Sequence, residues 1–139
     1  MKTAVVYWSG TGNTEIMAAK VADGAKAAGA DVSIFTASQF SADMLDGFDC
    51  VALGCPSMGD EQLEESEFEP MFLACMEGLK KKKVGLFGSY GWGDGGWMRS
   101  WEELCGNNGI FLAADSVICC GAPDDGVSAE LAELGRALA

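Results

Sequence analysis

The fold is decided near the N-terminus by the stretch TAVVYWSGTGNTEIM, residues 3–17. Residues Thr3 to Tyr7 are apolar after the first position, which is typical of a strand buried on both faces of a parallel sheet. A glycine-rich turn follows. A helix is then predicted from Asn13 to Ala28, because apolar side chains recur there at helical spacing, and Gly29 suits its end. A strand, a turn and a helix in this order indicate an α/β protein.

The same pattern continues along the chain, with no internal repeat and no low-complexity linker. Short apolar or β-branched runs predict further strands at Asp31–Thr36, Cys50–Gly54, Val84–Gly88 and within Ile110–Cys120. The segments between them predict helices at Ser41–Leu45, Pro70–Leu79, Gly96–Cys105 and Ser128–Leu138. We expect one domain over residues 1–139, with a parallel sheet and helices on both faces. Such sheets bind ligands beyond the carboxyl ends of their strands.

Composition excludes several classes of protein. The chain has 139 residues and a formal net charge of −12. This charge disfavours nucleic acid and anionic membranes as partners, and it favours basic proteins or simple solubility. No apolar run is long enough to cross a bilayer and no secretory signal is recognised, so we expect a cytoplasmic location.

The six cysteines form no C-x-x-C pair, and the chain has no histidine. Zinc and iron–sulfur sites are therefore disfavoured, and we interpret the cysteines as reduced thiols. Without histidine there is no Ser-His or Cys-His catalytic arrangement. We expect neither a metal site nor catalytic residues.

The turn after the first strand predicts a phosphate site. Its residues are Ser9-Gly10-Thr11-Gly12-Asn13-Thr14. The glycines let backbone N–H groups face a ligand, the helix N-terminus adds unpaired N–H groups, and four side chains add donors. No Lys or Arg lies between Thr3 and Ala19, so the donors are neutral. The Lys of a P-loop and the third glycine of a dinucleotide fingerprint are both absent. An ordinary glycine-rich turn with a Ser or Thr cap is the alternative.

The turns after the third and fourth strands predict two walls for a planar ring. They read Cys55-Pro56-Ser57-Met58-Gly59-Asp60-Glu61 and Ser89-Tyr90-Gly91-Trp92-Gly93-Asp94-Gly95. A Trp flanked by glycines lies in loop backbone and is not expected in the core. Met58 and Trp92 are placed to grip a flat ligand from opposite sides. The alternatives are core filling by Met58 and surface packing by Trp92.

Taken together, the three segments resemble the flavodoxins of the short-chain clostridial type. The similarity is carried by Tyr-Trp-Ser-Gly-Thr-Gly-Asn-Thr-Glu (7–15), Met-Gly-Asp-Glu (58–61), Leu-Glu-Glu-Ser-Glu-Phe-Glu-Pro (63–70) and Leu-Phe-Gly-Ser-Tyr-Gly-Trp-Gly-Asp-Gly (86–95). It spans almost the whole chain. It implies a three-layer sandwich with a five-stranded parallel sheet of order 2-1-3-4-5, FMN as the cofactor, and electron transfer without catalysis.

The resemblance also implies which residues hold FMN. The first turn would hold the phosphate, Met58 and Trp92 would flank the isoalloxazine ring, and the carbonyl of Gly59 would bind reduced flavin N5. Glu61 would bind the pyrimidine N3–H. The full cofactor set is Ser9, Gly10, Thr11, Gly12, Asn13, Thr14, Ser57, Met58, Gly59, Asp60, Glu61, Ser89, Tyr90, Gly91, Trp92 and Gly93. Pro56 and the segment 119–123 depart from the family pattern.

Charge around this site predicts how it works. Full reduction of the flavin adds negative charge beside an acidic rim, for which we take Asp60, Glu61, Glu64, Glu65 and Asp94. We therefore expect a low-potential couple between semiquinone and hydroquinone. The rim also favours redox partners with basic docking surfaces, of the kind that ferredoxins serve, and we expect a monomer. The alternatives are an FMN-dependent reductase on the same fold and an activator of a radical enzyme.

Overall fold

The structure is a computed structural model that describes residues 1–59 and 61–139. Over these residues, five parallel strands form one sheet of order β2-β1-β3-β4-β5. The strands are β1 (Lys2–Tyr7), β2 (Asp31–Thr36), β3 (Cys50–Gly54), β4 (Lys83–Tyr90) and β5 (Val117–Cys120). The expected sheet order is confirmed.

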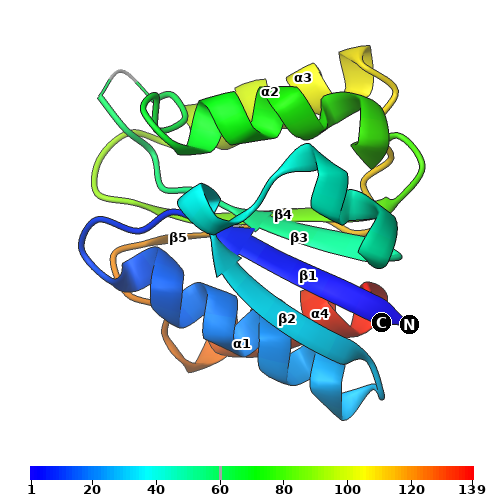
Figure 1. Ribbon diagram of the computed structural model, residues 1–139. Coiled ribbons are helices and arrows are strands. Elements are labelled where there is room, and N and C mark those ends of the chain that lie inside the picture. The colour runs from blue at the N-terminus through cyan, green and yellow to red at the C-terminus, as the bar shows by residue number, and fades with distance from the viewer. Residues whose placement is uncertain (60) are drawn as a thin grey trace.

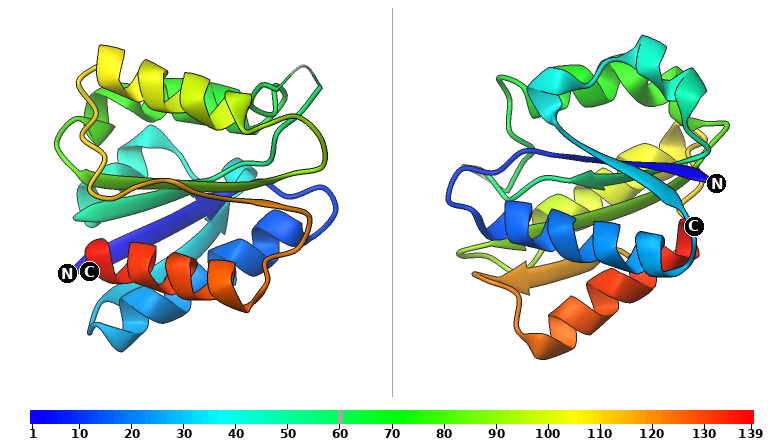
Figure 2. Two further views of the ribbon diagram at one scale, coloured as in Figure 1. Left: turned by 180° about the vertical axis from the view of Figure 1, so that it is seen from behind. Right: turned by 60° about the horizontal axis from the view of Figure 1, so that its bottom comes forward.

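Helices cover both faces of this sheet. The helices α1 (Asn13–Ala27) and α4 (Asp125–Ala137) lie on one face, and α2 (Phe68–Leu79) and α3 (Gly96–Asn107) lie on the other (Figures 1 and 2). The expected three-layer sandwich is therefore confirmed. In the part of the chain that the structure describes, no helix is both long and apolar enough to cross a membrane.

The buried strands explain the apolar runs of the sequence. In β1, Ala4 and Val6 belong to the core on the α2 and α3 side, and Val5 belongs to the core on the α1 and α4 side. Both faces of the strand are therefore removed from water, as a continuous apolar run requires. On the first side Trp97 and Trp101 are buried, and Trp101 packs edge-on against Phe68 and Phe72 at centroid distances of 5.4 and 5.8 Å.

Some element boundaries differ from the prediction. The short helix expected at Ser41–Leu45 is a 3₁₀ helix, η2 (Ala42–Gly47), and it follows another, η1 (Ala37–Gln39), that was not predicted. Of the segment Ile110–Cys120, only Val117–Cys120 is a strand. The preceding residues meet the sheet at a single bridge, between Leu112 and Val84, and Ile110 is buried. Burial, rather than strand pairing, accounts for the apolar Ile110, whereas the neighbouring Phe111 is exposed.

The loops at the carboxyl ends of the strands lie together. In Figure 1 the loops that follow β1, β3, β4 and β5 lie at the left, and the N- and C-termini lie at the opposite end of the sheet. This is the edge at which parallel α/β sheets bind their ligands.

Candidate functional site

A cavity of about 530 Å³ opens among these four loops. Every side chain that lines it is uncharged. The lining consists of Trp8, Ser9, Gly10, Thr11, Asn13, Thr14, Pro56, Ser57, Met58, Ser89, Tyr90, Gly91, Trp92 and Gly121. The three turns that the sequence singled out are therefore brought to one site.

The first turn presents free N–H groups to this cavity. Gly12 has a φ of +101°, which glycine adopts without strain, and its N–H is taken by the Ser9 hydroxyl at 3.1 Å. The helix α1 starts there without a side-chain cap, and its first backbone bond runs from the N–H of Ile16 to the carbonyl of Gly12 at 3.1 Å. The N–H groups of residues 13–15 therefore have no partner within the helix. Together with the positive end of the helix dipole, they give this end of the cavity a positive potential, although no lining side chain is a cation.

The turn after β3 is held by β4. The N–H of Cys55 donates to the carbonyl of Phe87 at 3.2 Å, and the N–H of Ser57 donates to the carbonyl of Ser89 at 3.0 Å. These bonds continue the ladder along β4 beyond the end of β3. Met58 therefore stands directly after a fixed backbone segment, on the wall of the cavity.

Met58 also closes a small loop. It exchanges two backbone hydrogen bonds with Gln62, at 2.9 and 3.0 Å. Within this loop Gly59 has a φ of +49°, which glycine adopts at little cost. Glu61 shares this region with a φ of +57°, which is uncommon for a residue with a side chain and was not predicted. Asp60 lies outside the described residues.

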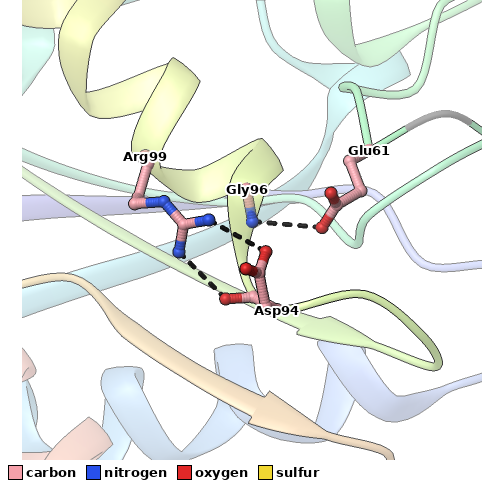
Figure 3. A network of polar contacts seen from close by, with 4 residues as sticks. All are labelled: Glu61, Asp94, Gly96 and Arg99. Atoms are coloured by element: carbon pink, nitrogen blue, oxygen red, sulfur yellow. Dashed lines mark hydrogen bonds and ion pairs between the residues drawn. The ribbon is translucent and has the colours of Figure 1, made fainter.

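Glu61 is not among the residues that line the cavity. Its carboxylate accepts the N–H of Gly96 at 3.1 Å, at the start of α3 (Figure 3). A Cβ on Gly93 would lie 2.4 Å from the same oxygen, so any other residue at position 93 would clash with the Glu61 carboxylate in this position. Glu61 thus links the loop after β3 to the loop after β4, and it caps a helix 35 residues away in sequence.

Trp92 stands out in solvent at the edge of the cavity. Its side chain is 62% exposed, whereas Trp97 and Trp101 are buried in the core. The expectation that Trp92 is a loop residue rather than a core residue is confirmed. The glycines on either side of it differ in what they require. A Cβ on Gly91 would meet open space, whereas Gly93 has a φ of +86°, which favours glycine.

Three lining residues were not predicted as site residues: Trp8, Pro56 and Gly121. Trp8 and Gly121 each directly follow a strand and Pro56 lies within a predicted turn, and these positions were the available signal. Gly121 is fixed by two bonds, because the Ser89 hydroxyl donates to its carbonyl at 2.5 Å and its N–H donates to the carbonyl of Tyr90 at 2.9 Å. The polar atom of Ser89 is thus partly used to hold the wall formed by the loop after β5.

The predicted site residues divide into two groups. Ser9, Gly10, Thr11, Asn13, Thr14, Ser57, Met58, Ser89, Tyr90, Gly91 and Trp92 line the cavity. Among the described residues, Gly12, Gly59, Glu61 and Gly93 do not line it, although each belongs to one of its loops.

Glu64 is not part of an acidic rim, so its placement there was wrong. It is buried, and its carboxylate accepts the N–H groups of Ser66, Glu67 and Phe68 at 2.8 Å each, together with the Ser66 hydroxyl. Burial alone would raise the pKa of Glu64, but these hydrogen bonds outweigh it and lower the pKa to about 2. This cap also explains why α2 begins at Phe68 rather than at Pro70.

The cysteines are free thiols, and five of the six are buried. Burial raises the pKa of the Cys55 thiol to about 12 and those of Cys75 and Cys105 to about 11. Such thiols pack as small apolar side chains. Over the described residues, no three His, Cys, Asp or Glu side chains are grouped to hold a metal ion.

The fold and this site define an α/β protein with an uncharged cavity at the carboxyl ends of its strands, lined by neutral donors and aromatic side chains. Comparison with known proteins makes the class specific. The flavodoxin family model matches residues 5–132. The flavodoxins of Megasphaera elsdenii and Clostridium beijerinckii are each 45% identical over 135 residues, which cover 97% of this chain and 96% and 97% of theirs. The solution structure of the two-electron reduced Megasphaera elsdenii flavodoxin aligns with a TM-score of 0.89 at 45% identity, over 98% of this chain and 97% of that one.

The chain therefore belongs to the flavodoxin family. It is an electron carrier that uses FMN, and it is not an enzyme. The expected cofactor and activity are confirmed, and the alternative of an FMN-dependent reductase is set aside. The cavity fits FMN, because it offers neutral N–H and hydroxyl donors at a helix N-terminus and soft or aromatic side chains at Met58, Tyr90 and Trp92.

Proposed function

We propose that this chain carries single electrons at low potential, between the one-electron-reduced and the fully reduced forms of FMN. The observation that supports this is an uncharged cavity beside loops that bear carboxylates. FMN supplies the electron chemistry when it is bound. Glu61, Glu65 and Asp94 lie on the adjoining loops, and Asp60 adds a further charge in the sequence. At about 10 Å and an effective dielectric near 20, each carboxylate disfavours an added negative charge by roughly 1–2 kcal/mol before salt screening.

The first turn is proposed to hold the FMN phosphate. Donors surround the start of α1: the free N–H groups of residues 13–15, and groups of Ser9, Gly10, Thr11, Asn13 and Thr14. Gly12 shapes this turn, and its own N–H donates to the Ser9 hydroxyl. Since this site holds no cation, the phosphate adds to the negative field at the ring. Neutral donors therefore both bind the cofactor and keep its potential low.

The second and third turns are proposed to hold the ring. Met58 and Trp92 pack against its two faces, and Ser57, Ser89, Tyr90 and Gly91 border it. The carbonyl of Gly59 would accept a hydrogen bond from the N5–H of the reduced ring, and the φ of +49° at Gly59 is accessible to glycine at little cost. Gly93 offers its backbone to the pyrimidine edge. Glu61, which uses one oxygen on Gly96, has a second oxygen for the pyrimidine N–H.

The acidic loops also suggest the partners. The carrier is proposed to act as a single-domain cytoplasmic monomer that docks on redox proteins with basic surfaces, of the kind that ferredoxins serve. Complementary charge raises the rate of encounter and loses its effect as salt rises. We expect the rate of electron transfer to a basic partner to fall steeply between low and high ionic strength.

A redox titration tests the proposed potential. Stepwise reduction with dithionite is followed by absorbance, and we expect a long-wavelength band from the one-electron-reduced flavin before the colour is lost. The variant Glu65→Gln should raise the potential of the second electron, whereas Glu130→Gln, an equally exposed change on α4, should move it less. Direct bleaching without the intermediate band, or equal shifts in the two variants, would contradict the proposal.

A further inference from the structure

The loop that carries Trp92 has little of its own to hold it in place. Between the end of β4 and the start of α3, residues 91–95 include three glycines, and Gly93 and Gly95 adopt φ values of +86° and +89°. Glycine-rich backbone loses much conformational freedom when it is ordered. The position of an exposed Trp on such a loop must therefore be set by contacts from elsewhere.

Two such contacts come from outside the loop. Glu61 accepts the N–H of Gly96 on one side. On the other side lies the guanidinium of Arg99, from the first turn of α3 (Figure 3). Its Nη1 donates to the carbonyl of Asp94 at 3.0 Å, and its Nη2 donates to Oδ1 of Asp94 at 2.8 Å.

The geometry of the Arg99 contact matters more than its charge. An exposed ion pair alone contributes little, and both side chains are largely exposed. Arg99, however, uses two nitrogens of its planar guanidinium to bind both the backbone carbonyl and the side chain of Asp94. This fixes the direction of the peptide between Asp94 and Gly95, which a point charge would not do. The hydrogen bond also holds the pKa of Asp94 below its ordinary value, so the pair persists in mildly acidic solution.

We propose that Arg99 is a positioning residue for the cofactor, because its grip on Asp94 fixes the loop 91–95 and so sets where Trp92 stands against the cavity. This rests on the proposed function, in which Trp92 forms one wall for the ring. Arg99 itself does not line the cavity. It acts through Asp94, and through the loop that Asp94 shares with Trp92.

Three variants separate position from charge. Arg99→Ala removes the grip and one positive charge. The double variant Arg99→Ala/Asp94→Asn also removes the grip but restores the net charge of the pair. Arg136→Ala is the matched control, since Arg136 forms a similarly exposed pair with Glu133 on α4, at 3.2 Å.

The first measurement is amide hydrogen exchange in the FMN-free protein. We expect the N–H groups of residues 92–96 to exchange about threefold to tenfold faster in Arg99→Ala and in the double variant, as for the loss of one exposed charge-assisted contact. In Arg136→Ala they should exchange at the wild-type rate. Because FMN is absent, this measurement does not depend on how the ring is bound.

The second measurement uses FMN at saturation. A stacked Trp quenches flavin fluorescence, so the residual fluorescence of bound FMN should rise in both Arg99 variants, and the Kd for FMN should rise about threefold to tenfold. Wild-type exchange and fluorescence in the double variant would show that Arg99 acts through charge, and would overturn the proposal. Equal effects in Arg136→Ala would overturn it too. Trp92→Phe tests the wall separately: unchanged quenching there would refute the proposed role of Trp92, while the exchange result would still stand on its own.

Discussion

The N–H of Ser57 donates to the carbonyl of Ser89 at 3.0 Å, beyond the last paired residues of β3 and β4. The loop after β3 therefore shares a backbone ladder with the last residues of β4, 32 positions further along the sequence, where both border the cavity. Ser89 continues this chain of contacts through its hydroxyl, which donates to the carbonyl of Gly121. The loops after β3, β4 and β5 are thus joined by hydrogen bonds, and the cavity wall is an extension of the sheet rather than a set of independent turns.

Glu64 should make the stability of the protein depend on acid. Its pKa is about 2 in the folded chain, against 4.5 for an ordinary Glu. A lowered pKa contributes stability above the unfolded value, and this contribution is lost as pH falls from about 4.5 towards 2. With solvent screening, the difference corresponds to about 1–3 kcal/mol in the free energy of unfolding at neutral pH. Urea unfolding of the FMN-free protein between pH 7 and pH 2 measures it.

The variant Glu64→Gln isolates this term. It keeps the size of the side chain but loses the charge that satisfies three N–H groups, so we expect a loss of about 1–3 kcal/mol at pH 7 and a flatter pH profile. Glu65→Gln is the control, because Glu65 is exposed one position further along. An unchanged pH profile in Glu64→Gln would show that the carboxylate does not cap α2.

Particular residues show which features of the fold and the site could be predicted from the sequence. The strand Thr3–Tyr7, the turn from Ser9 to Thr14 and the loop position of Trp92 were all predictable, because apolar runs and glycine spacing act locally. The role of Glu64 was not predictable. In the sequence it is one acid among several, and only the fold shows that its carboxylate turns inward onto the start of α2. Glu61 was likewise assigned to the ring, but its bond to Gly96 depends on two loops meeting in space.

Trp92 and Trp101 should respond to substitution in opposite ways. Trp92→Ala removes an exposed ring, so the free energy of unfolding of the FMN-free protein should change by less than about 0.5 kcal/mol. Its Kd for FMN should rise about tenfold to a hundredfold if the ring stacks there, since stacking contributes about 1–3 kcal/mol. Trp101→Ala leaves a cavity beside Phe68 and Phe72, and it should cost about 3–5 kcal/mol of stability. Urea unfolding and FMN fluorescence titration measure the two effects, and a Trp92→Ala protein with wild-type affinity would contradict the proposed wall.

The contact between the helices α1 and α4 should not tolerate a side chain at Gly135. A Cβ on Gly135 would lie 2.1 Å from the carbonyl oxygen of Val21, which is backbone and has no room to move aside. We expect Gly135→Ala to lower the free energy of unfolding by about 1–3 kcal/mol or more. Gly126→Ala, in the same helix, meets only the Asp124 side chain at 3.5 Å, so it should be neutral or stabilise by up to about 1 kcal/mol. Thermal unfolding of both variants checks this, and similar midpoints would mean that the two helices lie further apart.

The thiols should divide into one that reacts in the native protein and five that do not. Cys120 is exposed at the end of β5, whereas Cys50, Cys55, Cys75, Cys105 and Cys119 are buried. Burial raises the pKa of each of these five thiols, so both access and thiolate formation oppose their reaction. Titration with a disulfide reagent at mildly alkaline pH should label Cys120 rapidly and the others only after unfolding in urea. Cys120→Ser should remove the rapid phase entirely, and a rapid phase that survives in this variant would show that a second cysteine is open to solvent.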